Sequence, residues 1–139
     1  MNLRTTDYDT LARFRFLIRR FLQFSESVAH EAGLEPQQHQ MMLIIRASQE
    51  PGGPTVGVVA EHLLIRHHSA VGLVDRLEQR GLVERTRQST DRREVHLRLT
   101  ARGEQLLTDL SQAHYAELRK LAPQLLGALS GLLEEWAAR

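Results

Sequence analysis

The chain has 139 residues and a mass of 15.9 kDa, with 42% hydrophobic residues, 25% charged residues and no cysteine. We expect one domain over residues 1–139, which buries roughly two thirds of its unfolded surface and needs no covalent cross-link. The absence of cysteine excludes disulfides, thiolate metal sites and a thiol-oxidation switch. The formal net charge of +1 by itself indicates no class of partner.

Apolar runs in the sequence are short. Residues 41–45 form one of the longest, far below the roughly 20 residues that a membrane span needs. The first residues lack the apolar stretch of a signal peptide, so we expect no membrane association and a cytoplasmic protein. Leucine occupies 23 positions, and because leucine favours helices, a mainly helical fold is predicted.

Two helices are predicted in the first third of the chain. Apolar residues recur at steps of three and four over about residues 8–32, as in an amphipathic helix, and Gly33 suits its C-terminal end. Pro36 suits the first turn of a second helix, whose apolar side lies within residues 41–47. The Glu-Pro-Gly-Gly-Pro sequence of residues 50–54 predicts a loop.

A pair of short helices is predicted next. Thr55 is an N-cap candidate for a helix whose apolar positions run from Val56 to Leu64. The second helix is expected over about residues 68–80, with Gly81 as a left-handed C-terminal cap. Arg66 occupies the place of a capping residue, but an arginine has no acceptor for the capping hydrogen bond.

The spacing then changes from helical to alternating. Residues 82–87 and 95–99 are predicted to form two antiparallel strands joined by a polar turn, with His96 and Arg98 alternating with the apolar residues. Thr100 can cap a helix over about residues 101–121.

Pro123 predicts a kink or a restart before the last segment, where leucines recur up to Trp136. This segment and the first helix together are more apolar than one small domain can bury. A surface for a partner chain is therefore expected, although burial within the chain itself is the alternative.

Two short helices followed by a two-stranded hairpin with an arginine-bearing tip form the order of a winged helix-turn-helix. The residues from Val71 to Arg85, the Asp91-Arg92-Arg93 sequence and the segment from Leu97 to Gly103 closely resemble the MarR family of bacterial transcriptional regulators. The matching parts have the spacing of the family pattern, and the order and length of the flanking helices also agree.

The resemblance implies a mainly α fold with a small β-hairpin wing. Residues 36–100 would form the winged helix-turn-helix, and residues 8–33 and 101–139 the N- and C-terminal dimerisation helices. The implied function is that of a homodimeric transcriptional regulator of the repressor type, which binds double-stranded DNA at a near-palindromic operator. A small aromatic or phenolic effector would modulate its DNA affinity.

The candidate DNA-binding residues follow from the resemblance and from the predicted elements. Outward residues near the start of the recognition helix reach base edges, whereas basic residues of the wing face phosphates or the minor groove. Arg93 is favoured over Arg92 for the minor groove. The set comprises His67, His68, Ser69, Gly72, Arg76, Arg85, Arg87, Asp91, Arg92 and Arg93.

Several of these residues have a second interpretation. Arg76 is equally suited to a phosphate contact and to an internal salt bridge. Arg85 and Arg87 are either phosphate contacts or exposed strand residues without a function. His67 and His68 depart from the small hydroxyl residues common in the family, and Gly72 removes a side chain there, so the operator sequence stays open.

Other functional classes have weaker support. The seven histidines form no zinc motif, and no nucleophile elbow, phosphate loop or cysteine nucleophile is present, so we expect no enzyme and assign no cofactor or metal ligand. A winged-helix protein-interaction module and a metal-responsive regulator remain alternatives. Phe14, Phe21, His39 and Met42 are candidates to line an effector cleft, but core packing explains the apolar three equally well.

The near-zero net charge conceals an uneven distribution. Residues 55–103 carry 9 basic and 6 acidic side chains, for +3, whereas residues 1–54 sum to 0 and residues 104–139 to −2. The excess of positive charge lies in the predicted winged segment, as DNA binding requires.

Overall fold

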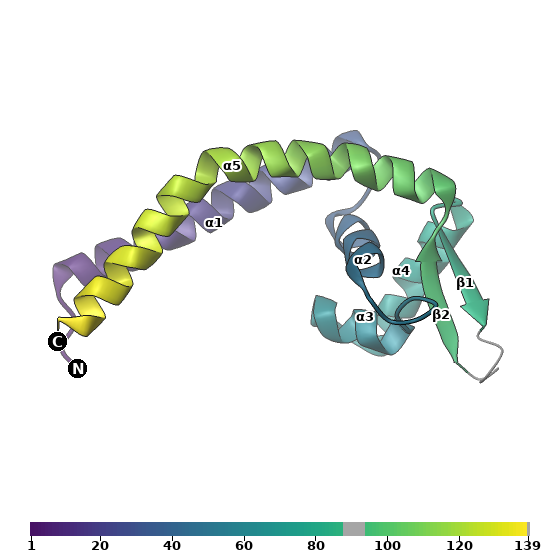
Figure 1. Cartoon of the computed structure of the whole chain (residues 1–139), viewed down its shortest axis with the longest axis horizontal. Coiled ribbons are helices and arrows are strands. Elements are labelled where there is room, and N and C mark those ends of the chain that lie inside the picture. Colours follow the sequence, from purple (N-terminus) through teal and green to yellow (C-terminus); the bar gives the residue numbers. More distant parts are fainter. Residues whose placement is uncertain (88–93, 139) are drawn as a thin grey trace. The chain divides into compact units, whose positions relative to one another are not determined.

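The computed structural model describes residues 1–87 and 94–138, except for the side chain of residue 135. The fold is mainly α with one two-stranded sheet, which confirms the predicted class. In chain order the elements are α1 (Thr5–Glu31), α2 (Pro36–Ala47), α3 (Val56–Leu63), α4 (His67–Gln79), β1 (Val83–Arg87), β2 (Val95–Leu99) and α5 (Ala101–Ala137) (Figure 1).

The chain divides into two compact units. We call residues 1–28 and 112–139 the two-helix unit, and residues 29–111 the winged unit. Within the described residues, no helix combines the length and apolar character needed to cross a membrane.

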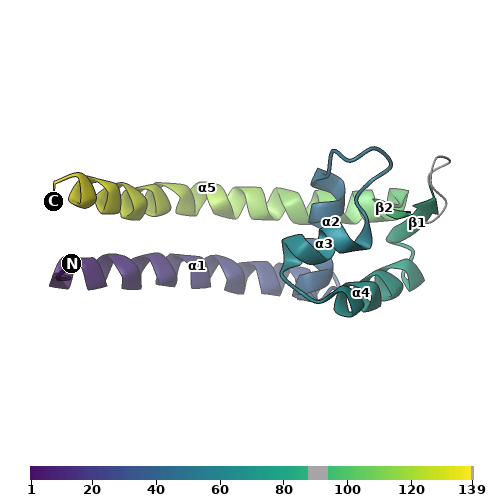
Figure 2. The ribbon, with the colours of Figure 1, turned by 90° about the horizontal axis from the view of Figure 1, so that it is seen from below.

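The winged unit is built on three short helices and the hairpin, which lie together in Figure 2. The strands pair antiparallel, with Val83 opposite Leu99, Arg85 opposite Leu97 and Arg87 opposite Val95. Apolar side chains from every one of these elements are buried in its core, among them Met41, Met42, Val59, Leu73, Val74, Leu77, Leu82 and Leu97.

The predicted helix ends are confirmed where a local signal specifies them. Gly33 and Gly81 have φ values of 76° and 71°, in the left-handed region where glycine carries no Cβ penalty. The Thr55 hydroxyl accepts a hydrogen bond from the Val58 amide at 3.3 Å, as an N-cap does. At Arg66 the N-cap position of α4 has no side-chain capping bond, as predicted.

The Leu-Thr-x-x-Gly sequence at the start of α5 has a structural role. The Thr100 hydroxyl accepts a hydrogen bond from the Gly103 amide at 3.0 Å and donates one to the Gly81 carbonyl at 2.6 Å. A Cβ on Gly103 would overlap the Leu82 carbonyl. The motif therefore joins the first turn of α5 to the turn between α4 and β1.

The loop before α3 packs directly on β2. The Leu97 amide donates to the Pro54 carbonyl at 2.8 Å, and Thr55 forms an isolated antiparallel bridge with His96. Gly53 has φ 96°, and a Cβ there would overlap the Leu97 carbonyl. Because this loop covers the strand, His96 is only 7% exposed, although it alternates with the apolar residues of β2.

In the two-helix unit, α1 and α5 run side by side, with the two chain termini at the same end (Figures 1 and 2). Leu17, Leu121 and Ala128 form its buried core, with Phe21 and Leu125 packed against them. The His114 imidazole lies between the helices, where its Nε2 is 2.8 Å from the Ser25 hydroxyl.

Of the two expectations at Pro123, the restart is wrong, because α5 is one helix from Ala101 to Ala137 with Pro123 inside it, whereas a kink is compatible with this helix. A proline within a helix removes one backbone hydrogen bond and costs about 3 kcal/mol. Burial of Leu121 and Ala128 on either side of it favours the unbroken helix.

Candidate nucleic-acid interface

The buried face of α4 determines which of its residues point outward. Ala70, Leu73, Val74 and Leu77 are buried in the winged unit. The other side of the helix is accessible, and it contains the predicted residues His67, His68, Ser69 and Arg76, which are exposed, and Gly72, which is half-buried.

The first turn of α4 is suited to an anionic partner. No acidic side chain lies in that turn, and no side chain caps the helix at Arg66. The first backbone N–H groups of a helix carry a partial positive charge and favour anions. With His67 and His68 exposed beside them, the turn can accept a phosphate group and present polar side chains to a base edge.

Gly72 is not required by packing. An added Cβ at this position would meet no heavy atom within 4 Å, and the residue lies inside a regular helix. At this position, about one turn after the start of α4, the outward side of the helix therefore has no side chain.

Arg85 connects β1 to α4. Its guanidinium donates to Asp75 Oδ1 at 2.6 Å and to Glu78 Oε1 at 2.7 Å, and its side chain is 28% exposed. The hydrogen bond to Asp75 raises the pKa of Arg85, so the group stays charged. Two carboxylates of the recognition helix thus already neutralise the arginine that the sequence suggested as a phosphate contact.

Arg76 and Arg87 have a different environment. Both are exposed, and neither side chain forms an ion pair with another described residue. Of the two interpretations of Arg76, an internal salt bridge therefore has no support among the described residues. Within the described part of the chain, no carboxylate therefore competes with an external anion for either guanidinium.

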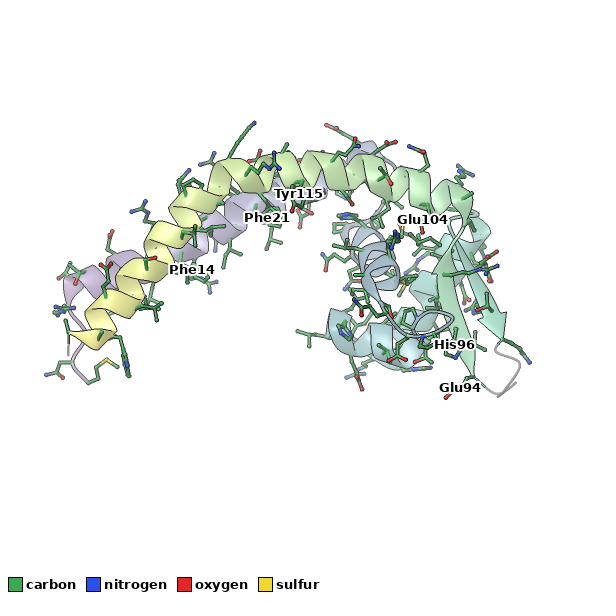
Figure 3. All side chains as sticks on the ribbon, in the orientation of Figure 1. Phe14, Phe21, Glu94, His96, Glu104 and Tyr115 are labelled. Carbon is green, nitrogen blue, oxygen red and sulfur yellow. The ribbon has the colours of Figure 1, made fainter. Side chains whose placement is uncertain are left out.

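At the base of the wing, each ring nitrogen of His96 lies close to an oxygen atom of another residue. Its Nδ1 lies 2.6 Å from the Gly53 carbonyl oxygen, to which it must donate, and its Nε2 lies 3.3 Å from Glu94 Oε2 (Figure 3). The Gly53 hydrogen bond and the nearby carboxylates raise the pKa of His96 against the opposing effect of burial. The predicted wing-tip residues Asp91, Arg92 and Arg93 lie outside the described residues.

A shallow groove of about 420 Å³ lies between α3, α4 and the wing. Thr55, His67, Val71, Arg85 and Glu94 are among its lining residues.

Of the candidates for an effector cleft, His39 and Met42 are buried in the winged unit, and Phe14 and Phe21 are half-buried in the two-helix unit. No group of three or more potential metal ligands converges within the described part of the chain.

Two features of this surface were missed by sequence reasoning. The acidic partners of Arg85 carry no motif of their own, although their spacing of three residues on α4 could have suggested a shared cation. Leu64 was expected among the apolar residues of a helix, but it lies beyond the end of α3 with its side chain 92% exposed. No signal in the sequence predicts that exposure.

Comparisons with known proteins agree with this architecture. A family model described as MarR family matches residues 32–94. The transcriptional regulator FarR of Neisseria gonorrhoeae is 34% identical over 85 residues, which are 61% of this chain and 56% of FarR. The chain therefore matches little more than half of the length of that relative.

Solved structures share the fold. A variant of MepR from S. aureus bound to an oligodeoxyribonucleotide has a TM-score of 0.70 at 19% identity, over 96% of this chain and 99% of MepR. CouR from Rhodococcus jostii, bound to p-coumaroyl-CoA, has a TM-score of 0.69 at 23% identity, over 85% of this chain and 81% of CouR. Residues 32–94 are therefore similar to the MarR family, and the chain shares the fold of these solved structures.

Proposed function

We propose that this chain is a sequence-specific DNA-binding transcriptional regulator that acts as a homodimeric repressor in the bacterial cytoplasm. The observation that supports this most strongly is the first turn of α4, which is exposed, uncapped and free of acidic residues on a helix whose opposite face is buried. In a helix-turn-helix this second helix enters the major groove. A binding function of this kind requires no catalytic residue.

Each contact has a separate task in the proposed complex. His67, His68 and Ser69 read base edges, and Gly72 gives the DNA closer access to the helix backbone. Arg76 and Arg87 bind phosphates, which position the protein without reading sequence. Asp91 orients the wing-tip arginines, of which Arg93, more than Arg92, enters the minor groove.

A second copy of the chain would complete the regulator. The two-helix unit leaves large apolar side chains exposed, including Tyr8, Phe16, Leu126, Leu133 and Trp136 at 59 to 69%. Exposed apolar surface of this extent is typical of an interface. A symmetric dimer would place two α4 helices on half-sites about one DNA turn apart, which implies a near-palindromic operator.

A small aromatic or phenolic effector is proposed to modulate DNA affinity. CouR, which shares the fold, was solved with an aromatic acyl-CoA ester, p-coumaroyl-CoA. A ligand with different affinities for two arrangements of the dimer would shift the DNA-binding population.

Selection of duplexes from a random-sequence pool tests the function. We expect the full-length protein to enrich a near-palindromic site with half-sites about one helical turn apart. The same selection with the His67→Ala and His68→Ala variants should recover a changed or relaxed site, because base readout is altered. Failure of the wild-type protein to enrich any sequence would favour the protein-interaction module.

A further inference from the structure

Leu64 has an unusual backbone conformation. It follows α3 with φ 56° and ψ 40°, and among the described residues it is the one non-glycine residue with positive φ. A side chain with a Cβ is disfavoured here, because the Cβ approaches the following carbonyl oxygen. Glycine or asparagine would adopt this conformation at lower cost.

The side chain of Leu64 gains almost no stabilising contact from the rest of the protein. Its exposed fraction of 92% is the highest of any large apolar side chain in the described part of the chain. The leucine side chain is therefore exposed to solvent at a position where glycine would adopt the backbone conformation at lower cost. Neither folding nor packing of the winged unit explains this choice of residue, which is the pattern expected of a functional site.

The turn holds this side chain in a defined place. The Leu64 amide donates to the Glu61 carbonyl at 3.2 Å, and the Ile65 amide donates to the Ala60 carbonyl at 3.1 Å. Two residues later, Arg66 begins α4. The leucine is thus presented at the corner between α3 and α4 by a turn closed with backbone hydrogen bonds.

The surroundings of this corner indicate the partner. His62, Arg66 and His67 are exposed beside Leu64, together with the uncapped start of α4, whereas Glu61 is the acidic neighbour. A partner that suits this mixture presents anionic groups next to apolar surface. DNA does so through its phosphates, its deoxyribose rings and the thymine methyl groups of the major groove.

We propose that Leu64 contacts operator DNA directly, packing against deoxyribose or thymine methyl groups beside the groove that α4 enters. This inference depends on the proposed function, because it assigns an additional contact to the same DNA-binding surface. The contact would be apolar, so it would add affinity without releasing counterions.

Binding of a duplex selected by the wild-type protein tests the contact, with Leu64→Asn as the main variant. Asparagine accepts positive φ, so the midpoint of thermal unfolding is expected to stay equal or to rise by roughly 2–4 °C. Affinity should fall about tenfold, because the polar amide no longer packs against the apolar surface of the DNA. The slope of log affinity against log salt should stay unchanged.

Two further variants separate the contact from other effects. Leu64→Met keeps an apolar side chain of similar length and should bind within about twofold of wild type. Leu43→Gln replaces another exposed leucine, on α2, and should bind like wild type. Equal affinity of Leu64→Asn and wild type, or an equal loss in Leu64→Met, would overturn the inference. Failure of the wild-type protein to select any duplex would overturn the proposed function instead.

Discussion

His96 is held beneath the α2–α3 loop by the hydrogen bond from its Nδ1 to the Gly53 carbonyl, and its Nε2 lies 3.3 Å from Glu94 Oε2. Its Nδ1 donates to the Gly53 carbonyl, so in the neutral ring the lone pair of Nε2 faces the Glu94 carboxylate. Protonation replaces that lone pair with a second N–H donor. The Gly53 hydrogen bond, Glu94 and the more distant Glu50 therefore raise the pKa of His96 in the folded protein.

The raised pKa predicts the direction in which stability changes with pH. The folded state binds the proton more tightly than the unfolded chain, so the stabilisation is complete below the unfolded value of about 6.5 and is lost as pH rises through the folded value. The thermal midpoint of wild type should exceed that of His96→Asn most at about pH 5.5, and the difference should shrink toward about pH 8.5. A difference that is constant or grows with pH would contradict this account.

Gly72 and Gly103 predict opposite responses to the same substitution. Gly72→Ala should raise the free energy of unfolding by about 1 kcal/mol, because alanine favours the helix and its Cβ meets no neighbour. Gly103→Ala should lower it, because its Cβ would overlap the Leu82 carbonyl. Urea unfolding of both variants measures the two effects. Destabilisation by Gly72→Ala would show that α4 needs the glycine for packing.

At the scale of elements, the recognition helix and the wing are joined through Arg85. This side chain bridges Asp75 and Glu78 of α4 from strand β1. The pairs are partly exposed, so each contributes modestly to stability. Their larger effect is expected on DNA binding, because removal of the arginine leaves two uncompensated carboxylates on the face that approaches phosphates.

A double-mutant cycle distinguishes this role from a phosphate contact. Arg85→Met should weaken DNA binding about tenfold, and adding Asp75→Asn should recover part of the affinity, because one unpaired carboxylate is then removed. Binding titrations of the single and double variants measure the coupling. If Arg85 instead bound a phosphate, Asp75→Asn would give no recovery, and Arg85→Met would reduce the salt slope by about 1 for each phosphate that is no longer bound.

Elements with local signals were predictable from the sequence. Gly33 and Gly81 end helices, Thr55 and Thr100 begin them, and the alternating apolar residues predict both strands. These signals act over a few residues and need no tertiary context. The same reasoning placed His67, His68, Ser69 and Arg76 on the accessible side of α4.

Features that depend on distant residues could not be predicted in this way. Burial of His96 requires the approach of Gly53, 43 positions away in the sequence. Pro123 stays within α5 because packing against α1 offsets its local cost, which the local rule does not include. The outward turn of Leu64 depends on where α3 ends, and the pairing of Arg85 depends on the position of β1 beside α4.

At the scale of the whole molecule, the proposed dimer explains the exposed apolar residues of the two-helix unit. Leu126 and Leu133 are 65% and 69% exposed, so a charge at either position leaves the core of the unit intact. The double variant Leu126→Glu with Leu133→Glu should sediment as a monomer with its helicity unchanged. DNA affinity should then fall by several orders of magnitude, because the two half-sites are no longer bound together.

A matched control for this change is Gln124→Glu, which adds a charge at an exposed polar position of the same helix. It should sediment like wild type. A dimer that persists in the double leucine variant would contradict the assignment of this face to the second copy.

The central claim, that the winged unit binds DNA through its positive surface, is tested most directly by the salt dependence of binding to a selected duplex. We predict that log affinity falls linearly with log salt with a slope of several units, and that Arg76→Ala reduces its magnitude by about 1 for each protomer bound. Binding whose affinity does not depend on salt would contradict this account. So would an Arg76→Ala variant that binds as tightly as wild type and has the same slope of log affinity against log salt.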